Sequence, residues 1–157
     1  MGNDRLLTSF NFLINLRIGD DKKSICSGEF SECDGLEMSM SPKTIREGGN
    51  NGRQIHLPAG ISYGQLTLKR GMSDSWDLWK WFEDIQKTPG LRAKGEVTML
   101  SSEVRPKSER QAEVKFHLTG CMPVKIKAPG LNAKDGQIAI EEMQIAYESM
   151  YAERVSS

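Results

Sequence analysis

Apolar residues recur at every second position near the start of the chain, between positions 10 and 18. This period of two predicts a strand with one buried face. A polar turn at 19–23 follows, and residues 24–40 predict a second strand, which Gly28 and Gly35 interrupt. A glycine inside a strand indicates a bulge or the close approach of another backbone. Together the two segments predict a long hairpin.

A short helix is predicted over residues 74–87, after a strand over residues 63–70. Asp74 occupies the N-cap position, and Asp77 lies in the first turn, where the helix dipole favours a negative charge. The helix carries large apolar residues at helical spacing. Its predicted core residues are Trp76, Trp79 and Phe82, which recur with Ile85 at helical spacing, and Leu78 and Trp81 widen the stripe. Side chains this large and apolar cannot stay in water, so we expect the helix to cover a sheet or the mouth of a barrel.

The second half of the chain predicts another hairpin, formed by residues 95–104 and 111–119. The last ordered stretch, residues 138–151, fits two patterns. Its glutamate and alanine content favours a helix, whereas its alternating apolar residues fit a strand whose faces switch at Glu141 and Glu142. The residues alone leave both interpretations open.

Residues 41–60 are polar, contain Pro42 and Pro58, and follow neither period. An irregular stretch of this length is uncommon in a compact domain and is usually functional or mobile. We therefore predict a long extended loop here. The chain as a whole predicts a single domain over residues 1–157, of mainly β class. We expect an antiparallel β-barrel or sandwich of six or seven strands with one packed helix.

The composition restricts the class of function. The 157 residues include 21 cations and 21 anions, whereas a dedicated nucleic-acid binder shows a basic excess. No apolar run approaches the roughly 20 residues of a membrane span, so no membrane anchor is expected. The first residues lack the apolar core of a secretory signal. We therefore expect synthesis in the cytoplasm without a signal peptide.

No motif predicts catalysis. The glycine-rich run at residues 47–51 lacks the Gly-Lys-Ser/Thr ending and the following helix of a phosphate-binding loop. Glu141 and Glu142 would face opposite ways on a strand, which makes them a poor acid–base pair. We predict no catalytic residue and no cofactor.

Three cysteines, Cys26, Cys33 and Cys121, form an odd count without a close pair. We interpret them as reduced, part-buried thiols. A metal site that combined them with His56 or His117 would lack the spacing of two to four residues that is typical of such sites. We predict no metal ion.

Several motifs have a familiar order. They are the loop Glu47-Gly48-Gly49-Asn50, the turn Leu57-Pro58-Ala59-Gly60, the strand Leu66-Thr67-Leu68-Lys69-Arg70-Gly71, the helix with Trp79 and Trp81, and the closing segment Met122-Pro123-Val124-Lys125. In this order the chain resembles the tail tube proteins of contractile-tailed phages and of extracellular contractile injection systems, over about residues 10–151. One departure is Gly120-Cys121-Met122, where the family often has a small residue and an aromatic before the proline.

The resemblance implies that six copies close into a ring and that rings stack into a tube inside a contractile sheath. It implies strands over residues 138–151 and an arm over residues 41–60 that reaches a neighbour or the next ring. The residues expected at contacts between subunits or rings are Glu47, Gly48, Gly49, Asn50, Asn51, Lys69 and Arg70. A polar lumen is expected if Arg17, Glu113, Lys115 and Thr119 face inward; the opposite faces would present Phe12, Val114 and Phe116.

The implied partners are further copies of the chain, a contractile sheath protein, baseplate and spike proteins, and a cap that terminates the tube. The lumen would hold protein effectors or DNA, and the assembled virion or phage-tail-like particle could be released from the cell. Two alternatives stay open. The chain could be a paralogue that forms one ring and adapts the spike to the tube. It could also belong to another class, as a small β-barrel protein that binds a ligand or a metal.

Overall fold

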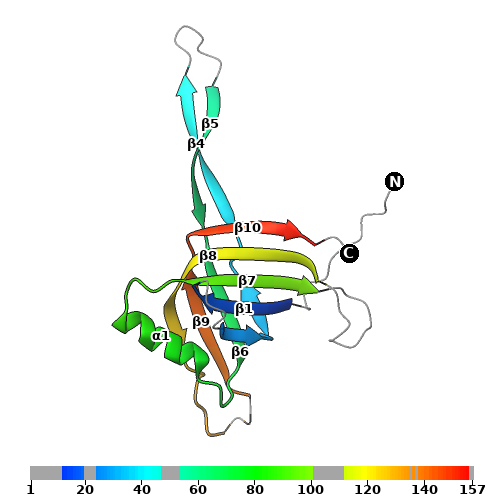
Figure 1. The fold of residues 1–157 in the computed structure, drawn as a ribbon, viewed down its shortest axis with the longest axis vertical. Coiled ribbons are helices and arrows are strands. Elements are labelled where there is room, and N and C mark those ends of the chain that lie inside the picture. The colour runs from blue at the N-terminus through cyan, green and yellow to red at the C-terminus, as the bar shows by residue number, and fades with distance from the viewer. Residues whose placement is uncertain are drawn as a thin grey trace, which may run out of the picture.

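The structure is a computed structural model that describes residues 12–19, 24–46, 54–100, 112–134, 136 and 138–155. These residues form ten strands and one helix (Figure 1). In chain order the elements are β1 (Phe12–Ile18), β2 (Ser24–Gly28), β3 (Glu32–Asp34), β4 (Met38–Arg46), β5 (Gln54–Tyr63), β6 (Gln65–Gly71), α1 (Asp77–Lys87), β7 (Ala93–Leu100), β8 (Ala112–Lys127), β9 (Ile140–Ala146) and β10 (Ser149–Arg154).

Eight of the strands form one antiparallel sheet in the order β2-β1-β7-β8-β9-β6-β3, and β10 also pairs with β8. The sheet bends into two layers. In Figure 1, β1, β7, β8 and β10 run across the view, while β6 and β9 run steeply behind them. The 16 residues of β8 belong to both layers, because its first part pairs with β7 and β10 and its last part pairs with β9.

The bend in β8 lies at a glycine. Gly120 has a φ of +63°, and a Cβ atom on it would lie 2.4 Å from Cδ of Glu148. A side chain at this position would therefore require both backbone strain and displacement of Glu148. Gly35 is a second close approach, since its Cβ would lie 1.8 Å from the carbonyl oxygen of Gln65. The sequence predicted such an approach, or a bulge, at Gly35.

The core lies between the two layers. Ile14, Leu16, Val97 and Leu118 face inward from the first layer, and the buried residues of the second layer are Leu66, Leu68, Met143 and Ile145. Alternate residues are buried in β1, β6, β7 and β9, as a period of two requires. The hairpin of β7 and β8 is confirmed, and residues 140–146 and 149–154 are strands, as the family resemblance implied.

The predicted core face of the helix needs correction. Leu78, Trp81 and Ile85 are its buried residues, whereas Trp79 and Phe82 are half-buried. Trp76 lies at the N-cap position, before the first helical residue, and is 55% exposed. The N-cap makes no side-chain hydrogen bond, so Asp74 does not cap the helix.

The strand count also differs from the six or seven predicted. The single strand expected over residues 24–40 divides into β2, β3 and the start of β4. The segment 41–60 does extend away from the body, but its described residues pair as the two strands β4 and β5. Both of its prolines fit this ribbon, in which Pro42 lies opposite Pro58. A two-stranded ribbon consists of edge strands only, where proline is tolerated.

Candidate functional site

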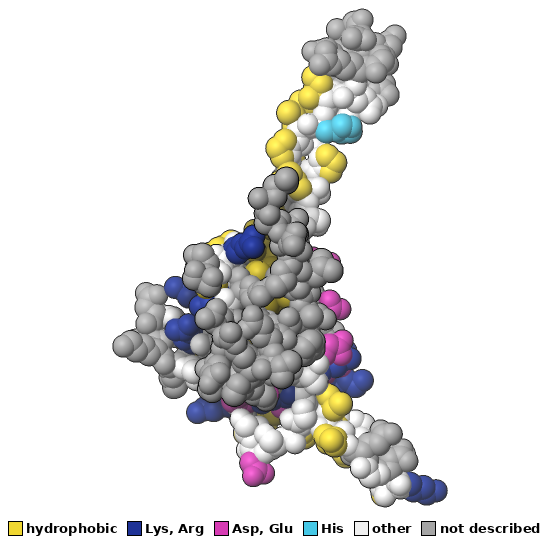
Figure 2. Space-filling view, turned by 90° about the vertical axis from the view of Figure 1, so that its right-hand side faces the viewer, with side chains coloured by type: hydrophobic (Ala, Val, Ile, Leu, Met, Phe, Trp, Pro, Cys, Tyr) yellow, Lys and Arg dark blue, Asp and Glu magenta, His cyan; other side chains and the backbone are white. Residues whose placement is uncertain are grey.

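The arm, defined as β4 and β5, forms a two-stranded sheet of its own and projects from one end of the body (Figure 1). None of its described side chains is buried. Its exposed large apolar side chains are Met38, Met40, Ile45, Leu57 and Ile61. Figure 2 shows hydrophobic side chains along the arm. Exposed apolar side chains gathered on a projecting element are typical of a surface that another protein covers.

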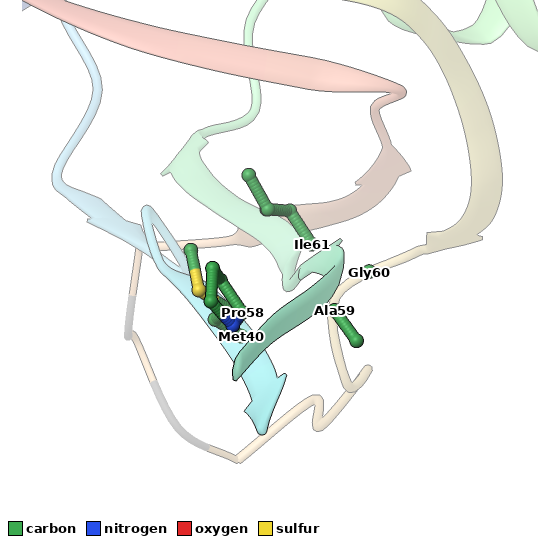
Figure 3. A pocket seen from close by; sticks show the side chains of 5 residues that line it. All are labelled: Met40, Pro58, Ala59, Gly60 and Ile61. Carbon is green, nitrogen blue, oxygen red and sulfur yellow. The ribbon is translucent and has the colours of Figure 1, made fainter. Parts of the chain in front are cut away.

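A register shift between Met40 and Ser41 bends the ribbon near its middle. At this bend Gly60 has a φ of +42°. An open pocket lies here, lined by Met40, Pro58, Ala59, Gly60 and Ile61 (Figure 3). The lining is apolar and carries no ionisable group, so the pocket suits an apolar side chain from a partner.

The arm meets the body at a short root, where the chain enters β4 and leaves β5. The hydroxyl of Tyr147 lies 2.7 Å from the carbonyl oxygen of Gly35 and 3.0 Å from that of Glu37. It also accepts a hydrogen bond from the backbone nitrogen of Glu37 at 3.2 Å. The amide of Gly64 donates to the Glu37 carbonyl at 3.1 Å. Sequence reasoning missed this anchor, because nothing in the pattern connects Tyr147 to residues more than a hundred positions earlier.

Of the predicted contact residues, Glu47, Gly48, Gly49, Asn50 and Asn51 lie outside the described residues. Lys69 lies on the surface of β6, with its Nζ 3.4 Å from Glu32 Oε2. Arg70 points the opposite way and is largely buried, with a side chain 14% exposed. The structure therefore does not bring these two cations to one surface.

Arg70 joins four parts of the fold. It forms an ion pair with Asp77 at the start of α1, and its Nε donates to Glu141 Oε1 on β9 at 2.6 Å. Its guanidinium also lies 5.3 Å from the ring centre of Phe30 and 3.6 Å from Cys26 Sγ. Nε1 of Trp79 donates to the second carboxylate oxygen of Glu141 at 2.9 Å, so both oxygens of this 1%-exposed carboxylate are hydrogen-bonded.

These contacts keep Arg70 and Asp77 charged. Burial by itself would raise the pKa of Asp77, but hydrogen bonds from the Arg70 guanidinium and the Leu78 amide hold this pKa below its usual value of 3.8. Burial would likewise lower the pKa of Arg70, and its hydrogen bonds to Asp77 and Glu141 raise it instead. The ion pairs of Arg70 therefore link α1 to the sheet.

A polar face covers the outer side of the first layer, opposite the core. Arg17, Glu96, Lys115 and His117 share it, and Glu96 lies within 4.0 Å of all three cationic or titratable neighbours. Nε2 of His117 lies 2.8 Å from Glu153, and the His117 ring stacks on Tyr151 with centroids 4.5 Å apart. Thr119 shares this side, because Leu118 beside it is buried. By contrast, Phe12 and Phe116 pack against the core.

The three cysteines are free thiols, of which Cys26 and Cys121 are buried and Cys33 is half-buried. Burial raises the pKa of each to about 12. In the described part of the chain, no three His, Cys, Asp or Glu side chains converge as a metal site would require. Among the same residues, no helix is long and apolar enough to cross a membrane.

Comparison with known proteins gives one family and a set of similar folds. Residues 8–151 match the family model described as T4-like virus tail tube protein gp19. No curated protein sequence matches the chain.

Three solved structures are similar over nearly the whole chain. A chain of the anti-feeding prophage baseplate has a TM-score of 0.79 at 22% identity and covers 100% of both chains. A chain of the PVC extracellular contractile injection system, from its sheath–tube complex, has a TM-score of 0.75 at 16% identity, covering 96% of this chain and 93% of the other. A chain of the anti-feeding prophage tube-terminating cap has a TM-score of 0.77 at 14% identity, with coverages of 99% and 95%.

Proposed function

The chain belongs to the family of T4-like virus tail tube proteins and is therefore a structural component of the tube of a contractile, phage-tail-like machine; we propose that six copies close into a ring and that the rings stack. The match to residues 8–151 is the observation that carries this proposal.

Ring closure would use the free edges of the sheet. Among the described strands, β2 and β10 each pair with one neighbour only and lie at the two ends of the run β2-β1-β7-β8-β10. An unpaired edge invites pairing with another chain. If β10 of one subunit paired with β2 of the next, the contact would join two different surfaces, and such contacts close into rings when the rotation permits.

The lumen would be lined by the polar face that holds Arg17, Glu96, Lys115 and His117. Its charges are paired with one another, so the surface offers hydrogen bonds without a strong field of one sign. Cargo of either proposed kind, protein effector or DNA, could pass such a wall without binding tightly. The apolar side of the same strands is committed to the core.

Stacking would use the arm. Its exposed apolar side chains and its apolar pocket would be covered by a subunit of the same or the next ring. The tip residues Glu47, Gly48, Gly49, Asn50 and Asn51 would contact that neighbour, and Lys69 would serve at the surface of β6. Arg70 would act from inside the subunit, by holding α1 and β9 in place.

The remaining proposed partners are other components of a phage-tail-like machine. We propose a contractile sheath protein around the tube, baseplate and spike proteins below it, and a cap that terminates it. The protein whose chain resembles this one with a TM-score of 0.77 belongs to a tube-terminating cap, and another belongs to a baseplate.

The proposal is tested by size-exclusion chromatography with light scattering, with negative-stain electron microscopy of each peak. The expected result is hexameric rings and hollow tubes. Single rings at every concentration would favour the alternative, an initiator that adapts the spike to the tube. A monomer at all concentrations that carries stoichiometric zinc would contradict the proposal and favour a metal-binding barrel.

Deletion of residues 48–52 tests the arm separately. The shortened chain is expected to fold, since among the described side chains of the arm only Tyr63, at its root, packs against the core, but it should no longer stack. Long tubes from this variant would show that the arm tip is dispensable for stacking.

A further inference from the structure

The arm is attached to the body by very few interactions. Its two strands pair with each other and with no strand of the main sheet. At the root, the chain passes through Gly35, Leu36 and Glu37 into β4 and returns from β5 through Gly64. The backbone bond from Gly64 to Glu37 ties the two sides of the root together, but it does not fix the ribbon to the body.

Leu36 and Tyr63 at the root pack against the core, and Tyr147 adds directional hydrogen bonds to this packing. Tyr147 lies between β9 and β10, and its ring is 6% exposed. One hydroxyl reaches the carbonyl oxygens of Gly35 and Glu37 at 2.7 and 3.0 Å and accepts from the Glu37 amide at 3.2 Å. Its ring also contacts that of Tyr63, the last residue of β5, with centroids 5.7 Å apart. Tyr147 thus contacts the residue just before β4 and the last residue of β5.

The close approach of Gly35 to Gln65 also lies at the root of the arm. Because the Cβ of any other residue at position 35 would lie 1.8 Å from the Gln65 carbonyl oxygen, the root can approach the start of β6 only with glycine. Gly35 permits the root to contact the start of β6. The hydrogen bonds of the Tyr147 hydroxyl then restrict the orientation of the root, because hydrogen bonds weaken steeply away from linearity.

A small change of angle at the root would be large at the tip. The nine residues of β4 span about 30 Å at roughly 3.3 Å per residue. A rotation of about 10° at the root would then move the far end by about 5 Å, which is about one inter-strand spacing. Docking on a neighbouring subunit could not tolerate an error of that size.

We infer that Tyr147 is the positioning residue that sets the direction of the arm, and that its hydroxyl thereby controls whether rings stack. This inference rests on the proposed function for its second part. Its first part, the direction of the arm, is a property of the single subunit and can be measured without assembly.

The measurement uses Tyr147→Phe, which removes one oxygen atom and keeps the ring in the core. Tyr63→Phe is the matched control, because Tyr63 shares the ring contact and its hydroxyl makes no hydrogen bond to any described residue. Spin labels would be placed at Lys43→Cys on the arm and Lys80→Cys on α1, both exposed, with Cys33→Ser to remove the half-buried thiol. Pulsed electron resonance on subunits kept below the assembly concentration then gives the distribution of distances from arm to body.

The label at Lys43 lies about 17 Å along β4 from Met38, at roughly 3.3 Å per residue, so a rotation of about 10° moves it by about 3 Å. We expect the distribution to broaden or shift by about 3 Å or more in Tyr147→Phe and to stay unchanged in Tyr63→Phe. The second readout, on unlabelled variants, is electron microscopy of assembled material. Tyr147→Phe should still form rings, while the subunit concentration needed for tubes rises at least tenfold; Tyr63→Phe should form tubes as the original chain does.

An unchanged distance distribution in Tyr147→Phe would overturn the positioning role. A broadened distribution with normal tubes would overturn the link between arm direction and stacking. If the original chain formed no tubes at all, the proposed function would fail, and the distance measurement would still decide whether Tyr147 positions the arm.

Discussion

Lys69 and Arg70 are neighbours on β6 with different environments. Adjacent residues of a strand point to opposite faces, which the sequence was enough to predict. Lys69 pairs with Glu32 at the surface, and Arg70 pairs with Asp77 and Glu141 inside. The inner carboxylates were not predictable, because Glu141 lies 71 positions away and only the pairing of β6 with β9 brings it opposite Arg70.

The two ion pairs should differ in their contribution to stability. Glu141→Gln removes one of the two carboxylates paired with the largely buried Arg70, which keeps Asp77, and should lower the free energy of unfolding by about 1–3 kcal/mol. Glu32→Gln removes a surface partner and should cost less than about 1 kcal/mol. Urea denaturation of both variants measures the difference, and equal losses would contradict the assignment of Glu141 to the interior.

The lowered pKa of Asp77 gives a pH dependence. A carboxylate whose pKa is lower in the folded than in the unfolded protein stabilises the fold at pH values above its pKa in the unfolded protein. This contribution is lost as the pH falls through its pKa in the folded protein. Asp77→Asn should therefore destabilise the protein by about 1–3 kcal/mol at pH 7. The difference from the original chain should shrink below pH 3.8. Thermal melts from pH 7 to pH 2 would test this, and a constant difference would contradict it.

The spacing of apolar residues predicted only some features of the helix α1. Its existence and approximate bounds followed from the spacing of apolar residues. The part of the apolar stripe that is buried did not, because apolar residues cover a broad arc of the helix. Burial selects Leu78, Trp81 and Ile85 since α1 packs against β2 and β8 on that side. Trp76 instead stacks on Trp79 at the surface, with centroids 5.5 Å apart.

The two tryptophans should respond differently to truncation. Trp81→Ala empties a fully buried site and should cost about 3–5 kcal/mol. Trp76→Ala changes an exposed residue and should cost about 0.5–1 kcal/mol. The measurement is the midpoint of urea unfolding, monitored by circular dichroism because both changes alter tryptophan fluorescence. A larger loss for Trp76→Ala would restore the core face that the sequence predicted.

The arm was predicted as an irregular extension and is a paired ribbon. Strand periodicity arises from burial of one face, and both faces of β4 and β5 are exposed, so the sequence carried no such signal. Met40→Asn and Ile61→Asn should change the stability of the subunit by no more than about 0.5 kcal/mol, because both side chains are more than half exposed. The same variants should shorten the tubes seen by electron microscopy. Ile145→Asn, in the core, is the contrasting control and should unfold the subunit.

At the scale of the whole molecule, the sequence predicted the class but not the order of the strands. The two hairpins join segments close in sequence and were recognised from their patterns. The pairings of β3 with β6 and of β6 with β9 bring together distant segments, and no local signal specifies them. β8 also contributes to both layers, and only the bend at Gly120 indicates where one layer ends.

The polar face predicts a specific pattern of accessibility. A cysteine at Thr98 or Lys115 on this face should react with a small maleimide both in free subunits and in tubes. In tubes, a maleimide on a large polymer should fail to reach it, because the face would line the lumen. A cysteine at Lys80 on α1 is the control for an outer surface. Mass spectrometry measures the labelling, and equal reaction of Thr98→Cys with the large reagent in tubes and free subunits would contradict the lumen assignment.

The low reactivity of the three thiols affects how long an assembled particle would resist oxidation. A thiol with a pKa of 9.0 is about one-tenth thiolate at pH 8, whereas a pKa of about 12, as for Cys26, Cys33 and Cys121, leaves on the order of one part in ten thousand. Since the thiolate is the species that reacts, oxidation and disulfide exchange would be slowed, though by less than the fall in thiolate because a more basic thiolate is the stronger nucleophile. A tube contains many identical copies, and damage to one could block it. Subunits whose thiols react this slowly would suit a particle that has to keep its geometry for a long time before it contracts once.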